Sequence, residues 1–493
     1  MIPSQYTFLN SQSKTPLVGA LRTSIAQKNV AFHSPGHKQG QGIPQSLEKL
    51  LGKTVFTADL PELPELDNLF APSGVIQKAQ ELAAEAFGAE NTWFLVNGST
   101  CGIVAAILAT CNPGDKIILP RNIHQSAIAG LILSGAVPIF LNPYYDPLWD
   151  LSYSITPNSL KQVLEENSDV KAVMIVYPTY HGICGDIKSI ADLTHRQGIP
   201  LLVDEAHGGH FTFHQDLPPC ALSMGADLTV QSTHKVLGAM TQAAMLHLQG
   251  TRIDPQKISR ALQLIESTSP SYLLLASLDA ARQQMALYGK ELLDKTLEFS
   301  EKARQQLSQI QGLSILDFKE PFGSFHYLDT TRLTVNVTAL GLSGFEVDEI
   351  FHQQLGITAE LPMLRHLAFI ISLGNTTDDI TKLISAFQIL SNSYFSPNLP
   401  IPSSPNLPIP QSSHPLFSPR ETFFAVTEMI NFNCSIGRIS GDLICPYPPG
   451  IPILMPGEKI TAQTLEYLQT VLALGASVIG CSDSSLQKLK VLT

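Results

Sequence analysis

The sequence has little charge and no basic cluster, and these shortages exclude several classes of protein. Charged residues make up 15% of the 493 residues, and the net charge is −11. Since no basic run could neutralise phosphates, we expect no nucleic-acid partner. No stretch of ~18 uninterrupted apolar residues occurs, so we expect no membrane span. The N-terminus lacks a basic start followed by an apolar run, which argues against a secretory signal.

Cysteine is also scarce. The seven cysteines are spread widely and form no CxxC pair, which fits free thiols in a reducing cytoplasm better than a disulfide framework or a zinc knuckle. A hydrophobic content of 44% is ordinary for a folded protein and excludes wholesale disorder. The length suits two or three domains rather than one core. We therefore expect a cytoplasmic, globular, multidomain protein.

Short apolar runs alternate with helical patterns over residues 31–248. The expected strands are 91–96, 116–119, 137–141, 172–176 and 200–203, and the expected helices are 101–111, 126–134 and 187–197. Strands that are almost wholly apolar belong to sheets with both faces covered. The alternation therefore predicts an α/β fold with a mostly parallel sheet and helices on both sides.

The second half of the chain combines a long helical pattern with proline-rich segments. A long helix is expected over 272–310, followed by strand and helix patterns at 333–337, 347–355, 367–372 and 380–391. The heptapeptide SPNLPIP occurs at 396–402 and again at 404–410, which is typical of a semi-rigid linker. Residues 445–458, CPYPPGIPILMPGE, are so rich in proline and glycine that we expect an ordered loop without strands.

These patterns predict five parts of the chain. They are an N-terminal arm (1–30), a large domain (31–270), a long helix with a small α/β domain (271–395), a proline-rich linker (396–414) and a C-terminal α+β domain (415–493).

Two carboxylates and three histidines follow the expected strand 200–203, in LVDEAHGGHFTFH (202–214). Asp204 lies at the carboxyl end of the strand, where open α/β sheets bind ligands, and could bind a metal, cap a helix or pair with a cationic ring nitrogen. His207, His210 and His214 would share one face only in a helix. Gly208 and Gly209 disfavour that helix, which weakens the metal interpretation.

Two further stretches carry groups suited to chemistry. In NGSTCG (97–102), Ser99, Thr100 and the start of a helix could bind an anion, or the turn could be an ordinary one with an N-cap threonine. In QSTHK (231–235), Lys235 follows an apolar run. If it is desolvated there, its pKa falls and its amine becomes nucleophilic; otherwise it is a solvated lysine.

A single ligand would use all three motifs, and it is pyridoxal phosphate. Its phosphate would lie at the helix start, Lys235 would form the Schiff base, and Asp204 would keep the pyridine nitrogen protonated. Each group can reach one site from a different strand of the same sheet.

The motifs together resemble the ornithine/lysine/arginine decarboxylases of aminotransferase-like fold, in a short form without a receiver-like N-terminal domain. The resemblance runs in order from about residue 30 to 460, outside the proline linker. It is carried by FHSPGHKQG (32–40), LPELDNLFAPSG (63–74), NGSTCG, RNIHQS (121–126), YPTYHGICGD (177–186), VDEAHGGHF, QSTHK and PYPPGIPILMPGE (446–458).

The resemblance implies a role for eight residues around the cofactor. Lys235 would carry the Schiff base, Asp204 would pair with the ring nitrogen, His207 would lie near the phenolic oxygen, and His124 would stack on the ring. The phosphate would be contacted by Ser99, Thr100, Ser232 and His234.

Some residues depart from the family pattern or receive no role from it. Gln125 stands where the family usually has lysine, and Ile103 where it commonly has asparagine, which leaves the local charge near the ring open. The resemblance gives His210 and His214 no role, and we expect them to be structural.

The expected reaction is decarboxylation of a basic amino acid, arginine or lysine before ornithine, in polyamine metabolism. His234 and Lys235 are candidates for returning a proton to Cα. A cationic side chain calls for carboxylates, for which the candidates are Glu62, Glu65, Asp67 and Glu458, with a capping or surface role as the alternative. We expect a homodimer or larger homo-oligomer with a shared site.

Other functions stay open on the residues alone. An aminotransferase or a carbon–carbon lyase could use the same scaffold, and the product would separate them from a decarboxylase. A non-catalytic, cofactor-binding regulator is a second alternative, against which the intact Lys235 argues.

Overall fold

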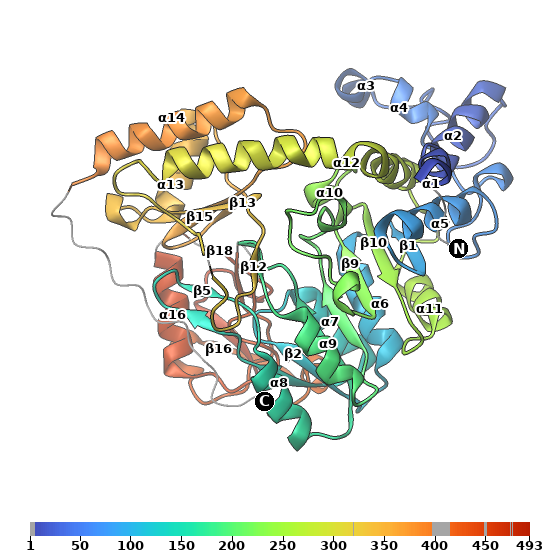
Figure 1. The fold of residues 1–493 in the computed structure, drawn as a ribbon. Helices are drawn as coiled ribbons and strands as arrows, with labels where there is room; N and C mark the ends of the chain where they lie inside the picture. Colours follow the sequence, from blue (N-terminus) through green and yellow to red (C-terminus); the bar gives the residue numbers. More distant parts are fainter. Residues whose placement is uncertain (1–4, 319, 397–414, 448–450, 474, 476) are drawn as a thin grey trace.

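The computed structural model describes residues 5–318, 320–396, 415–447, 451–473, 475 and 477–493 (Figure 1). A seven-stranded sheet in the order β1-β10-β9-β8-β6-β2-β3 forms its centre. Its strands are β1 (Asn91–Leu95), β2 (Lys116–Pro120), β3 (Val137–Leu141), β6 (Val170–Val176), β8 (Leu201–Asp204), β9 (Leu228–Gln231) and β10 (Ala244–Leu248). The pairs from β9 to β3 are parallel, whereas β10 is antiparallel to both its neighbours.

Helices cover both faces of this sheet because its strands are apolar on both sides. One face packs against α6 (Gly98–Thr110), α7 (Gln125–Ser134) and α11 (Pro255–Ile265). The other packs against α5 (Val75–Phe87), α8 (Pro157–Glu166), α9 (Ile187–His195) and part of α12 (Tyr272–Leu307). The mostly parallel α/β sheet expected from the sequence is confirmed. Strand β10 was not expected.

Helix α12 joins two hydrophobic cores along its 36 residues. Leu275, Leu278 and Met285 pack in the core of the large sheet, whereas Ala303 and Leu307 pack in a second core. This second core lies under a four-stranded antiparallel sheet, β11-β13-β15-β14, with strands Ser314–Ile315, Arg332–Asn336, His366–Ile370 and Leu361–Pro362 in that order. Helices α13 (Gly344–Ile350) and α14 (Thr377–Tyr394) cover it (Figure 1). The helix expected over 347–355 is α13 followed by a π-helical turn, Phe351–Leu355.

The C-terminal part of the described chain has its own core. It contains α15 (Pro419–Phe424), α16 (Ala462–Ala473) and two strand pairs, β16 (Thr427–Asn431) with β19 (Lys488–Leu492) and β17 (Cys445–Tyr447) with β18 (Ser477–Ile479). Most of the expected linker, residues 397–414, lies outside the described residues.

The prediction that residues 445–458 contain no strand is wrong at β17. Pro446 pairs with Val478 in a two-stranded ribbon. Proline is tolerated there because its missing N–H can face away from the single partner strand.

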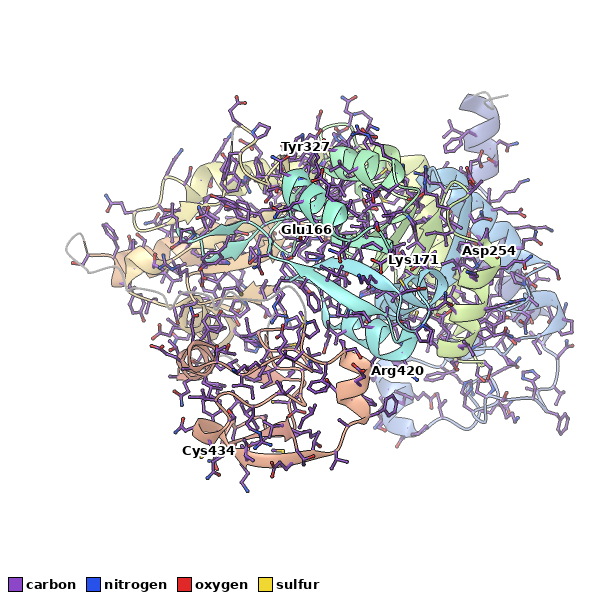
Figure 2. All side chains as sticks on the ribbon, turned by 90° about the horizontal axis from the view of Figure 1, so that it is seen from below. Glu166, Lys171, Asp254, Tyr327, Arg420 and Cys434 are labelled. Atoms are coloured by element: carbon purple, nitrogen blue, oxygen red, sulfur yellow. The ribbon has the colours of Figure 1, made fainter. Side chains whose placement is uncertain are left out.

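Arg420 joins the C-terminal part by hydrogen bonds to α7, one of the helices that cover the large sheet. Its guanidinium donates to the carbonyls of Ile132 and Leu133 in the last turn of α7, where a cation also offsets the helix dipole. Figure 2 labels Arg420 on α15, where the C-terminal part meets the helices of the large sheet. Within the described ranges, no helix has the length and apolar character needed to cross a membrane.

Candidate active site

Five of the eight predicted cofactor residues line one cavity at the carboxyl ends of the parallel strands. Asp204 is the last residue of β8, Lys235 lies in the short helix α10 (Thr233–Val236) after β9, and His124 is the N-cap of α7 after β2. The cavity is lined by Ser99, Asn122, His124, Val176, Pro178, Tyr180, Asp204, Ala206, His207 and Lys235. Its empty volume is about 410 Å³, open solvent included.

Lys235 is held inside this cavity against aromatic rings. Its Nζ lies 3.0 Å from Nε2 of His207 and 5.6 Å from the ring centroid of Tyr180. Burial lowers the pKa of Lys235, although the negative charges of Asp204 and Glu360 oppose the shift. A larger share of neutral amine results, which is the nucleophilic form expected from the sequence.

Asp204 is a buried carboxylate beside the same amine. Its Oδ1 accepts a hydrogen bond from the Ala206 N–H at 3.2 Å, and 6% of the residue is exposed. Burial raises the pKa of Asp204, opposed by the charges of His124 and Lys235. A cationic ring in the cavity would offset the desolvation of this carboxylate.

The expected phosphate end is built from the start of α6 and from Ser232. The Ser232 hydroxyl donates to Oγ of Ser99 at 2.8 Å. Helix α6 begins at Gly98, three residues earlier than expected, so that Ser99 and Thr100 lie in its first turn. The N-cap is Asn97, and the alternative of an N-cap threonine is therefore wrong.

The close packing behind this turn requires glycine at position 102. A Cβ on Gly102 would lie 2.6 Å from Cγ1 of Val230 and 2.7 Å from Cδ1 of Leu95. The glycine thus lets the start of α6 sit close to the ends of β1 and β9.

Three of the eight predicted cofactor residues do not line the cavity. Ser232 is buried behind Ser99, to which its hydroxyl donates. Thr100 is exposed beside it. His234 is half-buried, and its Nδ1 lies 2.8 Å from the carbonyl of Ala243. Their phosphate contacts remain predictions.

The four predicted substrate carboxylates do not line this cavity either. Glu62 and Asp67 accept backbone N–H groups of the loop before α5 and of its first turn, and Glu65 accepts a hydroxyl of α2 (Pro16–Gln27). Glu458 forms an ion pair with Arg121, in which two guanidinium N–H groups donate to its two oxygens at 2.5 and 2.7 Å. Each has a local structural partner, and a substrate contact for any of them remains a prediction.

The motif-based prediction assigned no role to Asn122 or Tyr180, although both line the cavity. The Asn122 side chain donates to the carbonyl of Tyr153 at 2.9 Å, and its Oδ1 is buried without a partner in the described parts of the chain. Both lie in stretches already singled out, RNIHQS and YPTYHGICGD, so their place in the motifs was the available signal.

The three histidines of the 202–214 stretch point to three separate partners. His207 contacts Lys235, Nε2 of His210 lies 3.1 Å from Oδ2 of Asp329, and Nε2 of His214 lies 2.8 Å from Oδ1 of Asp294. Oδ2 of Asp329 also lies 3.6 Å from Nε of Arg332. The Nη2 group of the same arginine donates a hydrogen bond to the carbonyl of His207. Asp329 and Arg332, just before and at the start of β13, thus form a buried ionic cluster that supports the backbone of His207.

This cluster predicts a large loss of stability on replacing Asp329 with asparagine. The substitution removes the carboxylate that faces a buried arginine and a buried histidine. Leaving the buried guanidinium charge of Arg332 uncompensated costs about 3–5 kcal/mol. Urea unfolding followed by circular dichroism would measure the loss.

The matched control is Asp294→Asn, which also removes the carboxylate partner of a histidine in this stretch. The Asp294 side chain is 52% exposed, so its loss should cost less than about 1 kcal/mol. Equal losses in the two variants would contradict the role given to the buried cluster.

Two family models match the chain. Residues 15–327 match "Orn/Lys/Arg decarboxylase, major domain", and residues 411–482 match "Orn/Lys/Arg decarboxylase, C-terminal domain". An arginine decarboxylase of Bacillus subtilis is 38% identical over 486 residues, and one of Bacillus anthracis is 39% identical over 497 residues. Each alignment covers 98% of both chains.

Solved structures show the same fold. The lysine decarboxylase of Francisella novicida superposes with a TM-score of 0.82 at 22% identity, covering 97% of this chain and 81% of its own. An alanine–glyoxylate aminotransferase of Nostoc superposes with a TM-score of 0.52 at 18% identity, covering 63% of this chain and 85% of its own. The aminotransferase-like fold expected from the resemblance is confirmed.

Proposed function

Since the chain belongs to the Orn/Lys/Arg decarboxylase family and decarboxylates a basic amino acid, we propose that it binds pyridoxal phosphate on Lys235 and converts arginine to agmatine. The observation that carries the proposal is the buried Lys235 amine, with its lowered pKa, in one cavity with Asp204. Arginine is favoured because relatives named arginine decarboxylases are 38% and 39% identical over almost the whole chain. These findings do not favour an aminotransferase or a non-catalytic regulator.

The residues of the cavity fit the cofactor group by group. Asp204 is a buried carboxylate that a cationic ring nitrogen would stabilise. Nδ1 of His207 is buried and has no hydrogen-bond partner within the described ranges, so the ring is available to a phenolic oxygen. The hydroxyl of Ser99 stands in the first turn of α6 and accepts a hydrogen bond from the Ser232 hydroxyl, an arrangement that favours a phosphate.

When bound, the cofactor supplies an electron sink for the pair released as the bond from Cα to the carboxylate breaks. Lys235 would hold the cofactor covalently and leave it when the substrate amine arrives. Asp204 would hold a proton on the ring nitrogen, and His124 would stack on the ring. After carbon dioxide has left, Lys235 or His234 would return a proton to Cα.

We further propose a cytoplasmic homodimer or larger homo-oligomer that works in polyamine metabolism. All seven cysteines are free, which suits a reducing compartment. Thr100 is exposed beside the phosphate end of the cavity, where a second subunit would have access to it.

A comparison of three substrates tests the proposed function. Carbon dioxide release from arginine, lysine and ornithine should be measured side by side on the protein reconstituted with pyridoxal phosphate. We expect kcat/KM for arginine to exceed the other two by at least about 100-fold, since a side chain that leaves buried polar groups unpaired is strongly rejected. Formation of a keto acid instead of agmatine would indicate an aminotransferase and would contradict the proposal.

A further inference from the structure

A second, larger cavity adjoins the one that holds Lys235. The two share Asn122, Val176 and Tyr180 as walls. The larger one has an empty volume of about 1140 Å³, open solvent included. It lies between the large sheet, the small domain and the C-terminal part, which contribute for example Thr179, Met363 and Ile453.

Most of the walls of this second cavity are apolar. Leu151, Phe345, Leu364, Ile453 and Val471 are examples that come from different parts of the fold. Such walls suit a chain of methylene groups, which gains free energy by leaving water. They would not stabilise a charged group unless a counter-charge stood among them.

Asp150 supplies a negative charge in this cavity. It precedes β5 (Leu151–Ser152) in a hairpin with β4 (Tyr145–Asp146), and its Oδ1 accepts a hydrogen bond from the Tyr145 hydroxyl at 2.5 Å. Burial raises the pKa of Asp150 to about 6, and Tyr145 and the positive charge of Arg365 oppose the shift. The desolvation of this carboxylate is therefore only partly compensated by its neighbours.

The other ionic group on the walls is already neutralised. Arg121 lines the cavity, and its guanidinium is bound at two points by Glu458, which leaves little net charge there. The Arg365 guanidinium donates to the carbonyl of Leu148 at 3.2 Å. Among the described residues of the cavity wall, Asp150 is thus the one carboxylate, and no two-point ion pair with an arginine neutralises it.

We infer that this cavity receives the side chain of the substrate and that the Asp150 carboxylate binds its distal cationic group. The inference rests on the proposed function, which puts the reacting Cα beside Lys235. The shared walls let a side chain pass from one cavity into the other, its methylenes against apolar residues. A carboxylate can then accept two parallel N–H groups of a guanidinium.

The test is Asp150→Asn in the protein reconstituted with pyridoxal phosphate. We expect KM for arginine to rise by about 10- to 100-fold, because a hydrogen bond to a charged group is lost, while kcat changes less than about threefold. Asp146→Asn is the matched control: it lies in the same hairpin, accepts the Tyr153 hydroxyl and does not line the cavity. An equal rise in both variants would assign the effect to the hairpin's shape and overturn the inference.

A binding measurement separates this inference from the proposed function. Calorimetry should show that Asp150→Asn weakens agmatine, which is cationic, by about 10- to 100-fold. It should leave citrulline, whose side chain is an uncharged isostere of that of arginine, unchanged. If the wild type released no carbon dioxide from arginine, the proposed function would fail, yet the agmatine comparison would still decide the role of Asp150. Unchanged agmatine binding would overturn that role.

The pH dependence gives an independent readout. Tyr145, Arg365 and Tyr467 are the titratable groups that interact with Asp150 from its hairpin, the small domain and α16. Below a pKa of about 6 the Asp150 carboxylate is protonated and attracts a cation less, so agmatine affinity in the wild type should fall as pH drops through 6. The affinity of Asp150→Asn should be flat over that range, and a parallel fall in the variant would argue against the inference.

Discussion

Replacing Lys235 with alanine should reduce decarboxylation by on the order of 10⁴-fold or more, which equals about 5.4 kcal/mol of transition-state stabilisation. The substitution removes the one lysine amine among the described residues that line the cavity of Asp204 and His207, and with it the proposed covalent attachment of the cofactor. The loss should appear in kcat, because an attachment that is missing cannot be restored by saturating substrate. Single-turnover carbon dioxide release would measure it.

Borohydride reduction followed by peptide mass spectrometry supplies the chemical readout for this prediction. In the wild type we expect the label on Lys235, and in Lys235→Ala we expect none. Lys188→Ala is the control, since Lys188 is 63% exposed and pairs with Asp192 on the surface of α9. It should keep full activity and full labelling. A label on any other lysine of the wild type would refute the central assignment.

The large sheet could be predicted because its strands carry their own signal. Strand β3 has the bounds expected from the run VPIFL, and β2, β6 and β8 differ from expectation by a few residues at their ends. Antiparallel β10 was missed, although its five residues are all buried. Its sequence, AMLHL, contains no β-branched residue, so the local preference for a strand is weak.

Sheet geometry predicts the site residues at the ends of strands, but not those in the neighbouring helices. Asp204 ends β8 and Lys235 follows the neighbouring parallel strand β9, and since the carboxyl ends of both strands meet at one edge, the two residues share a cavity. Thr100 could not be placed in this way. Consecutive residues of a helix point about 100° apart, and once α6 begins at Gly98, Ser99 faces the cavity while Thr100 does not.

The second cavity was beyond prediction for a different reason. Its walls come from segments more than 300 residues apart, such as Asp150 and Tyr467, and the packing between domains decides whether they meet. In the proline-rich stretch 445–458 the sequence pointed to Glu458 as a substrate carboxylate, whereas the residues that line the cavity include Ile451 and Ile453. Long-range packing of this kind has no local sequence signal.

Replacing Asp204 with asparagine should slow decarboxylation by about 10³-fold. A carboxylate about 4 Å from a cationic ring nitrogen contributes about 4 kcal/mol at an effective dielectric constant of 20, and each factor of ten in rate corresponds to about 1.36 kcal/mol. Asparagine keeps the hydrogen bond from Ala206 and the buried volume, so the fold should be preserved. The loss should appear in kcat, since the proposed partner of Asp204 is the cofactor ring rather than the substrate side chain.

A modified cofactor separates this electrostatic role from a structural one. Asp204→Ala, which leaves room in the cavity, can be reconstituted with pyridoxal phosphate methylated at its ring nitrogen. That nitrogen is permanently positive and needs no carboxylate to hold a proton, so we expect this pair to regain at least about tenfold of the lost rate. The same analogue should not help Lys235→Ala. If Asp204→Ala recovered nothing while it still bound the analogue, the carboxylate would be acting through the shape of the cavity, and its assignment to the ring nitrogen would be wrong.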